Sequence, residues 1–139
     1  MGNAYWEHFE HKADIGIRGF GNTLSEAFAQ AAMAMTAVVT DIALVQATTV
    51  TNISCSAADN DTLLYDWLNA LIYEMATRKM LFSKFEVTID DGNLEAKAYG
   101  EAIDIERHQP VVEIKGATYT ELDVVRQAQQ WVAQCVIDV

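Results

Sequence analysis

Hydrophobic residues recur along the chain at two different spacings, and these spacings predict its secondary structure. Residues 14–21 alternate apolar positions with small or charged ones, which is typical of a strand. Apolar residues then recur at every third or fourth position over 24–38, and Thr23 followed by Glu26 has the pattern of a capping box, so a helix is predicted there. Residues 48–56 are rich in β-branched side chains and are predicted to form a strand.

The second half of the chain repeats these two patterns. A wide apolar face that begins after a cluster of acidic residues predicts a helix over 60–78. Asp91-Gly92 separates two alternating segments, which is a strong signal of a β-hairpin. Residues 101–110 contain the only proline and are expected to form a connection. A last hairpin is expected to pair 111–125 with 130–139.

The predicted order of elements is β-α-β-α-β-β-β-β. Strands mixed with two helices in this order favour an α+β fold, in which the helices cover one face of a mainly antiparallel sheet. This order is compatible with two strand–helix–strand–strand units, although the two halves share little sequence. Neither a linker nor a low-complexity segment interrupts the sequence, so we expect one compact domain over residues 1–139.

Composition and charge narrow the class of function. Half of the residues are hydrophobic, which indicates a folded globular protein. The formal net charge is −11, from 9 basic and 20 acidic residues. This charge weighs against direct nucleic-acid binding, because phosphates are held by Lys and Arg. It suits a basic protein partner or divalent cations, although solubility alone is an equally simple explanation.

Nothing in the sequence points to a membrane or to secretion. No stretch approaches the roughly 18 consecutive apolar residues of a membrane span, and the N-terminal residues do not resemble a signal peptide. Cys55 and Cys135 lie in separate apolar segments without a CxxC motif, so two buried free thiols in a reducing cytoplasm are expected.

Two aspartates stand at positions that strand patterning does not explain. Asp is disfavoured in strands, yet Asp14 begins one predicted strand and Asp138 lies near the end of another. A partly buried carboxylate is stable only when it is paired, hydrogen-bonded or bound to a metal. The simpler alternatives are a turn residue for Asp14 and a frayed terminal residue for Asp138. Spacing alone does not bring them together.

Other polar residues have simple structural explanations. Lys115 is expected in a strand interior, where the plain interpretation is a solvent-facing lysine. His11 and His108 are expected to be ordinary surface or loop histidines. The glycines of the first predicted strand do not match a dinucleotide-binding loop. Glycines in a strand more often mark a bulge or the close approach of another backbone.

Several segments, in order and over nearly the whole chain, together resemble the archease family. The first leads from a His-x-Ala-Asp-Ile-Gly pattern into a helix, the second matches the family's second helix, and the last ends with a penultimate Asp. These segments are WEHFEHKADIGIRGFGNTLSEAFAQAA, LLYDWLNALIY, GEAIDIERHQP followed by EIKGATY, and WVAQCVIDV.

The resemblance implies a non-catalytic partner protein of the RtcB-type RNA ligase. That ligase works in tRNA splicing and RNA repair and uses GTP and divalent metal, and archease promotes its guanylylation and multiple turnover. The family fold consists of tandem strand–helix–strand–strand units. The resemblance also implies a divalent-cation site at Asp14 and Asp138, to which the chain end at Val139 adds a carboxylate. Lys115 and His11 would lie nearby and face the partner or a phosphate.

Oxygen ligands of this kind suit Ca²⁺, Mg²⁺ or Mn²⁺. The chain departs from the family pattern at three positions, where Lys12, Gly116 and Thr120 replace a common Thr, Ala and His. The loss of that histidine removes any role it has in other members. Two alternatives stay open: a stand-alone metal-dependent phosphohydrolase that uses the same carboxylates, and a metal-free protein-interaction module.

Overall fold

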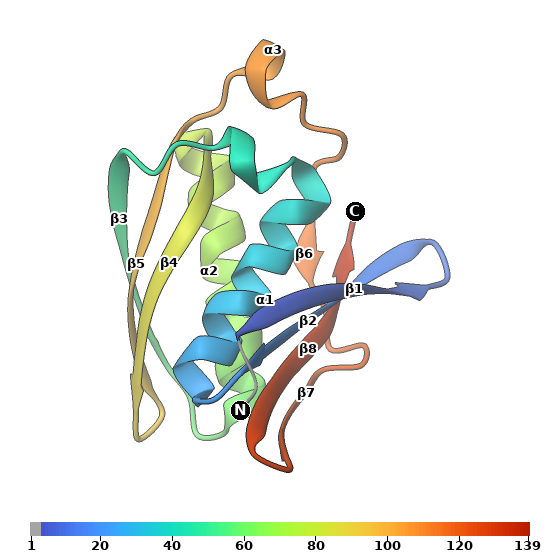
Figure 1. The fold of residues 1–139 in the computed structure, drawn as a ribbon, viewed down its shortest axis with the longest axis vertical. Helices are drawn as coiled ribbons and strands as arrows, with labels where there is room; N and C mark the ends of the chain where they lie inside the picture. The colour runs from blue at the N-terminus through green and yellow to red at the C-terminus, as the bar shows by residue number, and fades with distance from the viewer. Residues whose placement is uncertain (1–3) are drawn as a thin grey trace.

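The computed structural model describes residues 4–139 and contains two antiparallel sheets with two long helices between them (Figure 1). The first sheet has five strands: β1 (Tyr5–His11), β2 (Asp14–Gly21), β8 (Gln130–Asp138), β6 (Gly116–Ala117) and β7 (Asp123–Gln127). The second sheet has three strands in the order β3 (Thr49–Ser56), β5 (Asn93–Ala102) and β4 (Met80–Asp90). The α+β class with mainly antiparallel pairing is therefore confirmed.

The two long helices lie where the apolar periodicity predicts them. Helix α1 spans Leu24–Val39, and its N-cap Thr23 accepts a hydrogen bond from the backbone N–H of Glu26. Helix α2 spans Asn60–Arg78 and is capped in the same way by Asp59. Both helices contact both sheets. Their buried side chains, with Phe28 and Trp67 among the largest, form one core with the inner faces of the sheets.

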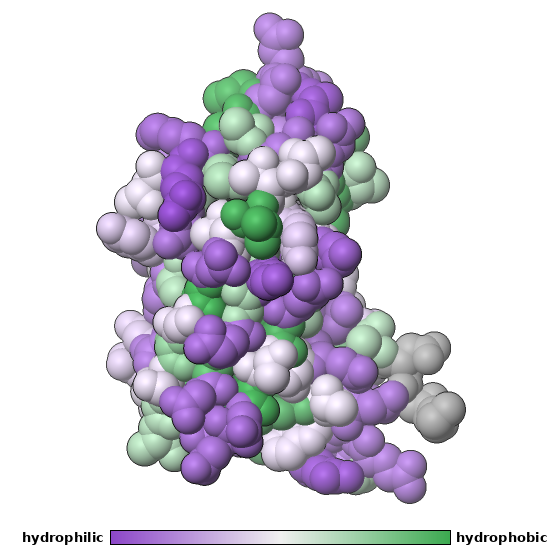
Figure 2. Space-filling model, turned by 90° about the vertical axis from the view of Figure 1, so that its left-hand side faces the viewer, coloured by the Kyte–Doolittle hydropathy of each residue, from purple (hydrophilic) through white to green (hydrophobic). Residues whose placement is uncertain are grey.

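The strands of the three-stranded sheet lie close to where the sequence pattern predicts them. Strands β4 and β5 form the predicted hairpin around Asp91 and Gly92, both of which have positive φ. Strand β3 pairs with β5 along its whole length. Figure 2, which views the molecule from the left-hand side of Figure 1, shows a surface on which hydrophilic residues predominate and hydrophobic ones are scattered.

The five-stranded sheet contains a strand that the hydrophobic pattern does not predict. Tyr5–His11 forms β1 and pairs antiparallel with β2 over its full length. Strand β8 lies on the other side of β2, so the last strand of the chain is central in this sheet. Gly19 of β2 packs against the backbone of α1, since a Cβ there would overlap Ala27 O and Ala31 N. This contact bears out the close backbone approach that the glycines predict.

The last predicted hairpin is correct only in part. Strands β7 and β8 pair across Ala128 and Gln129, as expected. The segment 111–115, however, is not a strand, and β6 contains only two residues. Between β6 and β7 the chain does not pair with β8, and the pairing register with β8 differs by three residues between the two strands. Lys115 therefore precedes a short strand and does not lie inside a long one, which corrects its predicted position.

The connection between β5 and β6 contains the short helix α3 (Ile105–His108), and a 3₁₀ turn η1 (Ile42–Leu44) follows α1. The strand–helix–strand–strand unit occurs as β3–α2–β4–β5. A second strand–helix–strand–strand set is split in the sequence. Its β2 and α1 precede this unit, and its β7 and β8 follow it. In the described part of the chain, no helix is long and apolar enough to cross a membrane.

Candidate functional site at one end of the five-stranded sheet

The hairpin of β1 and β2 brings Asp14 to one end of the five-stranded sheet. His11 and Asp14 are the last paired residues of this hairpin, and Lys12 and Ala13 form the turn. Lys12 takes a positive φ of 55°, a conformation that non-glycine residues adopt uncommonly. His11 and Asp14 therefore lie next to each other across the β1–β2 ladder.

The pairing of β2 with β8 brings Asp138 to the same end. Ile15 pairs with Ile137 in the antiparallel ladder, so Asp14 and Asp138 are the next residues on the two neighbouring strands. Ile137 belongs to the core, and side chains alternate along a strand, so the aspartates belong to the sheet face that points away from the helices. Regular antiparallel ladders hold facing Cβ atoms about 4.5–5.5 Å apart. The register therefore gives the two carboxylates neighbouring positions.

Lys115 reaches this end of the sheet through its backbone. Its N–H donates a hydrogen bond of 2.8 Å to the carbonyl oxygen of Asp138, and Gly116 pairs with Asp138 in the β6–β8 ladder. The Lys115 side chain is exposed. Strands β1, β2, β8 and β6 thus bring together the predicted site residues. We call the group of Asp14, Asp138 and the following Val139 the acidic sheet end.

The carboxylates of the acidic sheet end have free oxygens. Within residues 4–139, the side chains of Asp14 and Asp138 take part in no ion pair or hydrogen bond, and both residues are half-buried. Two unpaired carboxylates at neighbouring strand positions repel each other, and a cation relieves that repulsion. Carboxylate oxygens are hard ligands that suit Ca²⁺, Mg²⁺ or Mn²⁺.

The side chains alone do not complete a metal site. Among the residues that the structure describes, no group of three or more His, Cys, Asp or Glu side chains is placed to hold a metal ion. Ca²⁺ takes 6–8 oxygen ligands and Mg²⁺ demands an octahedral set. A cation at the acidic sheet end therefore needs oxygens from the main chain, from water or from a binding partner in addition to the two aspartates.

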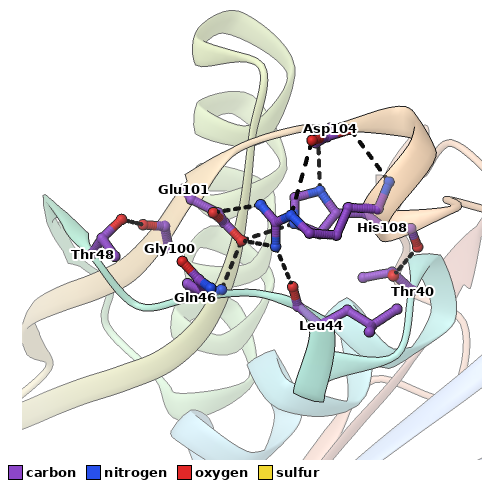
Figure 3. Close-up of polar contacts among 9 residues, drawn as sticks. Thr40, Leu44, Gln46, Thr48, Gly100, Glu101, Asp104 and His108 are labelled. Carbon is purple, nitrogen blue, oxygen red and sulfur yellow. Dashed lines mark hydrogen bonds and ion pairs between the residues drawn. The ribbon is translucent and has the colours of Figure 1, made fainter.

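A second polar cluster, which sequence reasoning missed, joins α3 to β5 (Figure 3). His108 is buried, contrary to the expected surface position, and its Nε2 lies 2.9 Å from Glu101 Oε2. The backbone N–H of Asp104 donates to His108 Nδ1 at 2.8 Å, so Nε2 carries the proton that is donated to Glu101. Arg107 makes a bidentate contact with Glu101, at 2.8 and 2.7 Å.

This cluster holds the connection in place. The Arg107 side chain also donates to the Leu44 carbonyl, and the backbone N–H of Gln46 donates to Glu101. These contacts, those of Arg107 first, lower the pKa of Glu101 to about 2. Because the hydrogen bonds of Glu101 are made with other groups of this protein, we interpret the cluster as a structural one that stabilises the connection. A seven-residue separation between Glu101 and His108 gives no sequence signal that would have revealed it.

The cysteines do not form a reactive site. Cys135 is buried and Cys55 is half-buried, and both are free thiols. Burial raises the pKa of Cys135 to about 12, and burial together with Asp66 and Glu95 raises that of Cys55 to about 11. Both are therefore protonated at neutral pH, and a protonated thiol is a poor nucleophile.

Comparison with known proteins gives a consistent result. The model of the archease protein family (MTH1598/TM1083) matches residues 6–139. The protein archease of Pyrococcus furiosus is 40% identical over 139 residues, covering 96% of this chain and 98% of the relative. That of Sulfurisphaera tokodaii is 38% identical over 136 residues, with the same coverage.

Solved structures agree with this comparison. Protein 1598 of Methanobacterium thermoautotrophicum superposes with a TM-score of 0.84 at 36% identity, covering 96% of this chain and 98% of that one. An archease from Thermotoga maritima, at 18% identity and 96% coverage of both chains, shares the fold with a TM-score of 0.64. The family match over nearly the whole chain, with these relatives, shows that the protein belongs to the archease family.

Proposed function

We propose that this protein is a non-catalytic activator of an RtcB-type RNA ligase, acting in tRNA splicing and RNA repair. It promotes GTP-dependent guanylylation of the ligase and multiple turnover. Membership of the archease family supports the choice of partner. The observation that carries the proposal is the acidic sheet end, where Asp14 and Asp138 occupy neighbouring strand positions with free carboxylate oxygens.

Asp14, Asp138 and Val139 would hold a divalent cation, Ca²⁺, Mg²⁺ or Mn²⁺. When bound, such a cation supplies positive charge that stabilises phosphate oxygens during nucleotidyl transfer. The chain's own contribution is to fix both aspartates on paired strands, so that they are preorganised before the partner arrives. Two protein carboxylates leave coordination positions for water or for oxygens of the ligase complex.

The charge of the protein suits a basic partner surface. A net charge of −11 favours association with the basic entrance of an RNA-binding enzyme and disfavours direct contact of this protein with RNA. Lys115, exposed beside Asp138, could meet a phosphate held by the ligase, and His11 lies beside Asp14 on the same side of the site. The protein would then work in the cytoplasm, where the ligase joins RNA.

The direct test is a time course of ligase guanylylation with and without this protein. Asp14→Ala and Asp138→Ala should each keep the fold and abolish the stimulation, because each removes one of the two side-chain ligands. Glu10→Ala is the matched control, since it removes one negative charge from an exposed position next to His11 but on the opposite sheet face. It should stimulate like the unaltered protein.

Two outcomes would contradict the proposal. Full stimulation by the Asp14→Ala, Asp138→Ala double variant would show that the acidic sheet end has no role. Turnover of nucleotide or of a cyclic phosphate by the pure protein would indicate a phosphohydrolase instead. Calorimetric titration with Ca²⁺, Mg²⁺ and Mn²⁺ tests the cation separately, and no heat of binding in any titration would indicate a metal-free interaction module.

A further inference from the structure

One stripe of helix α2 contacts the interrupted edge of the five-stranded sheet at three points. Asp61, Tyr65 and Asn69 are spaced by four residues and therefore lie on one face of the helix. Asp61 Oδ1 accepts a hydrogen bond of 2.8 Å from the backbone N–H of Val124 in β7. The Tyr65 ring stacks on the Tyr119 ring, with centroids 4.3 Å apart. Asn69 contacts β6.

Asn69 satisfies both backbone groups of Ala117. Its Oδ1 accepts from the Ala117 N–H at 3.1 Å, and its Nδ2 lies 3.5 Å from the Ala117 carbonyl oxygen. The same Nδ2 donates to the Tyr65 carbonyl oxygen at 3.1 Å, which ties the amide to its own helix. Strand β6 ends the strand order β1-β2-β8-β6, so Ala117 has no further strand beside it. The side-chain amide therefore takes the place of the missing neighbour.

A two-residue strand needs this kind of support. Edge strands leave unpaired N–H and C=O groups, and β6 has too few residues to be held by its ladder alone. Its pairs with β8 are Gly116 with Asp138 and Ala117 with Ile137. The next residue towards the N-terminus is Lys115, whose N–H is bonded to the Asp138 carbonyl oxygen. The position of Ala117 thus determines how Lys115 meets Asp138.

We propose that Asn69 is a positioning residue for the acidic sheet end: its amide replaces a neighbouring strand for Ala117 and thereby holds Lys115 against Asp138. The role of this end in cation binding rests on the function proposed above. Asn69 acts indirectly, through β6, because its side chain hydrogen-bonds to Ala117 and to neither of the aspartates.

Amide hydrogen exchange measured by NMR tests the positioning directly. Asn69→Ala removes both contacts with Ala117, and we expect the amides of Ala117 and Lys115 to exchange about tenfold faster, the effect of losing one to two net hydrogen bonds. Asn69→Asp keeps an acceptor for the Ala117 N–H and should restore part of the protection. Tyr73→Ala, an exposed change on the same helix, is the matched control and should leave both amides protected.

Titration with Mg²⁺, Ca²⁺ and Mn²⁺ gives the functional readout. We expect Asn69→Ala to weaken cation binding several-fold, with Asn69→Asp between it and the unaltered protein. Unchanged protection of Lys115 in Asn69→Ala would overturn the proposal, and so would faster exchange with unchanged cation affinity. If the unaltered protein binds no cation, the proposed function fails, while the exchange of Lys115 still decides whether Asn69 holds it in place.

Discussion

Gly19 of β2 packs directly against the backbone of helix α1. A side chain there would overlap Ala27 O and Ala31 N in the backbone of α1, and backbone atoms cannot move aside without shifting the helix. We expect Gly19→Ala to lower the free energy of unfolding by about 1–3 kcal/mol, as overpacked core positions do. Urea unfolding followed by circular dichroism measures this change.

Gly116→Ala is the control for this substitution. A Cβ at Gly116 would meet only Asn69 Oδ1, at the ordinary contact distance of 3.6 Å. Its urea midpoint should stay close to that of the unaltered protein. Equal destabilisation by the two substitutions would show that the α1 contact is not what requires glycine in β2.

Glu101 makes the stability of the protein depend on pH in the acid range. Its folded-state pKa, lowered to about 2 chiefly by the Arg107 hydrogen bonds, lies below its ordinary value. A carboxyl with a lowered pKa stabilises the fold above its unfolded pKa of about 4.3 and loses this contribution as pH falls towards 2. The stability difference between the unaltered protein and Glu101→Gln should therefore be constant above about pH 5.

Between pH 4.5 and 2 this difference should shrink, because protonation of Glu101 removes the negative charge that the Glu101→Gln variant already lacks. Urea midpoints at pH 6, 4 and 3 test the trend. A difference that grows as the pH falls would contradict the proposed ionised state of Glu101. A second prediction from the same contacts is that Arg107→Lys, which cannot reproduce the bidentate contact, shows the same trend more weakly.

At the level of single residues, the sequence singled out positions where a residue type conflicts with its local pattern. Asp14 and Asp138 stood out because carboxylates are disfavoured in strands, and the register of β2 and β8 gives them neighbouring positions. That they bind a cation stays a prediction. His108 could not be identified, because its burial depends on Glu101 and on the fold of the connection, and neither is encoded in the residues around it.

At the level of elements, the N-cap of α1 can be tested alone. The Thr23 side chain accepts from the Glu26 N–H, and the Glu26 side chain accepts from the Asn22 N–H. Thr23→Ala should lower the free energy of unfolding by about 1 kcal/mol, because one N-terminal N–H group loses its partner. Thr23→Ser keeps the hydroxyl and should cost much less. Thermal unfolding of both variants measures the effect, and equal midpoints would exclude a capping contribution.

Elements were predictable where the signals are local. The helices α1 and α2 have caps and a continuous apolar stripe, and the β4–β5 hairpin has Asp-Gly at its turn. Strand β1 was missed because Tyr5–His11 mixes aromatic, acidic and histidine residues, and because Lys12 forms its turn without glycine or asparagine. The predicted strand over 111–125 was too long. Only Gly116–Ala117 and the residues from Asp123 onwards pair with β8, and residue types alone do not show where the register between these two segments shifts.

For the molecule as a whole, a bound divalent cation should raise thermal stability. A ligand at one hundred times its dissociation constant stabilises the native state by about 2.7 kcal/mol. For a chain of 139 residues this corresponds to an increase in Tm of roughly 5–10 °C. Differential scanning calorimetry with MgCl₂, CaCl₂ or MnCl₂ measures the shift.

NaCl at the same ionic strength is the control for this experiment, because a protein with a net charge of −11 is also stabilised by general screening. Asp14→Asn and Asp138→Asn keep the size of each side chain and should remove the part of the shift that exceeds the NaCl effect. Equal shifts in the unaltered and substituted proteins would indicate that the cations act through screening alone.

The central position of β8 also has a consequence for how the chain assembles during synthesis. The unit β3–α2–β4–β5 is complete at residue 102 and can pair its strands while later residues are still being translated. The five-stranded sheet stays incomplete at that stage, since β8, which pairs with β2, is translated after this unit. A nascent chain therefore carries β2 with one edge unpaired until the ribosome has delivered β8, and only then do Asp14 and Asp138 first become neighbours.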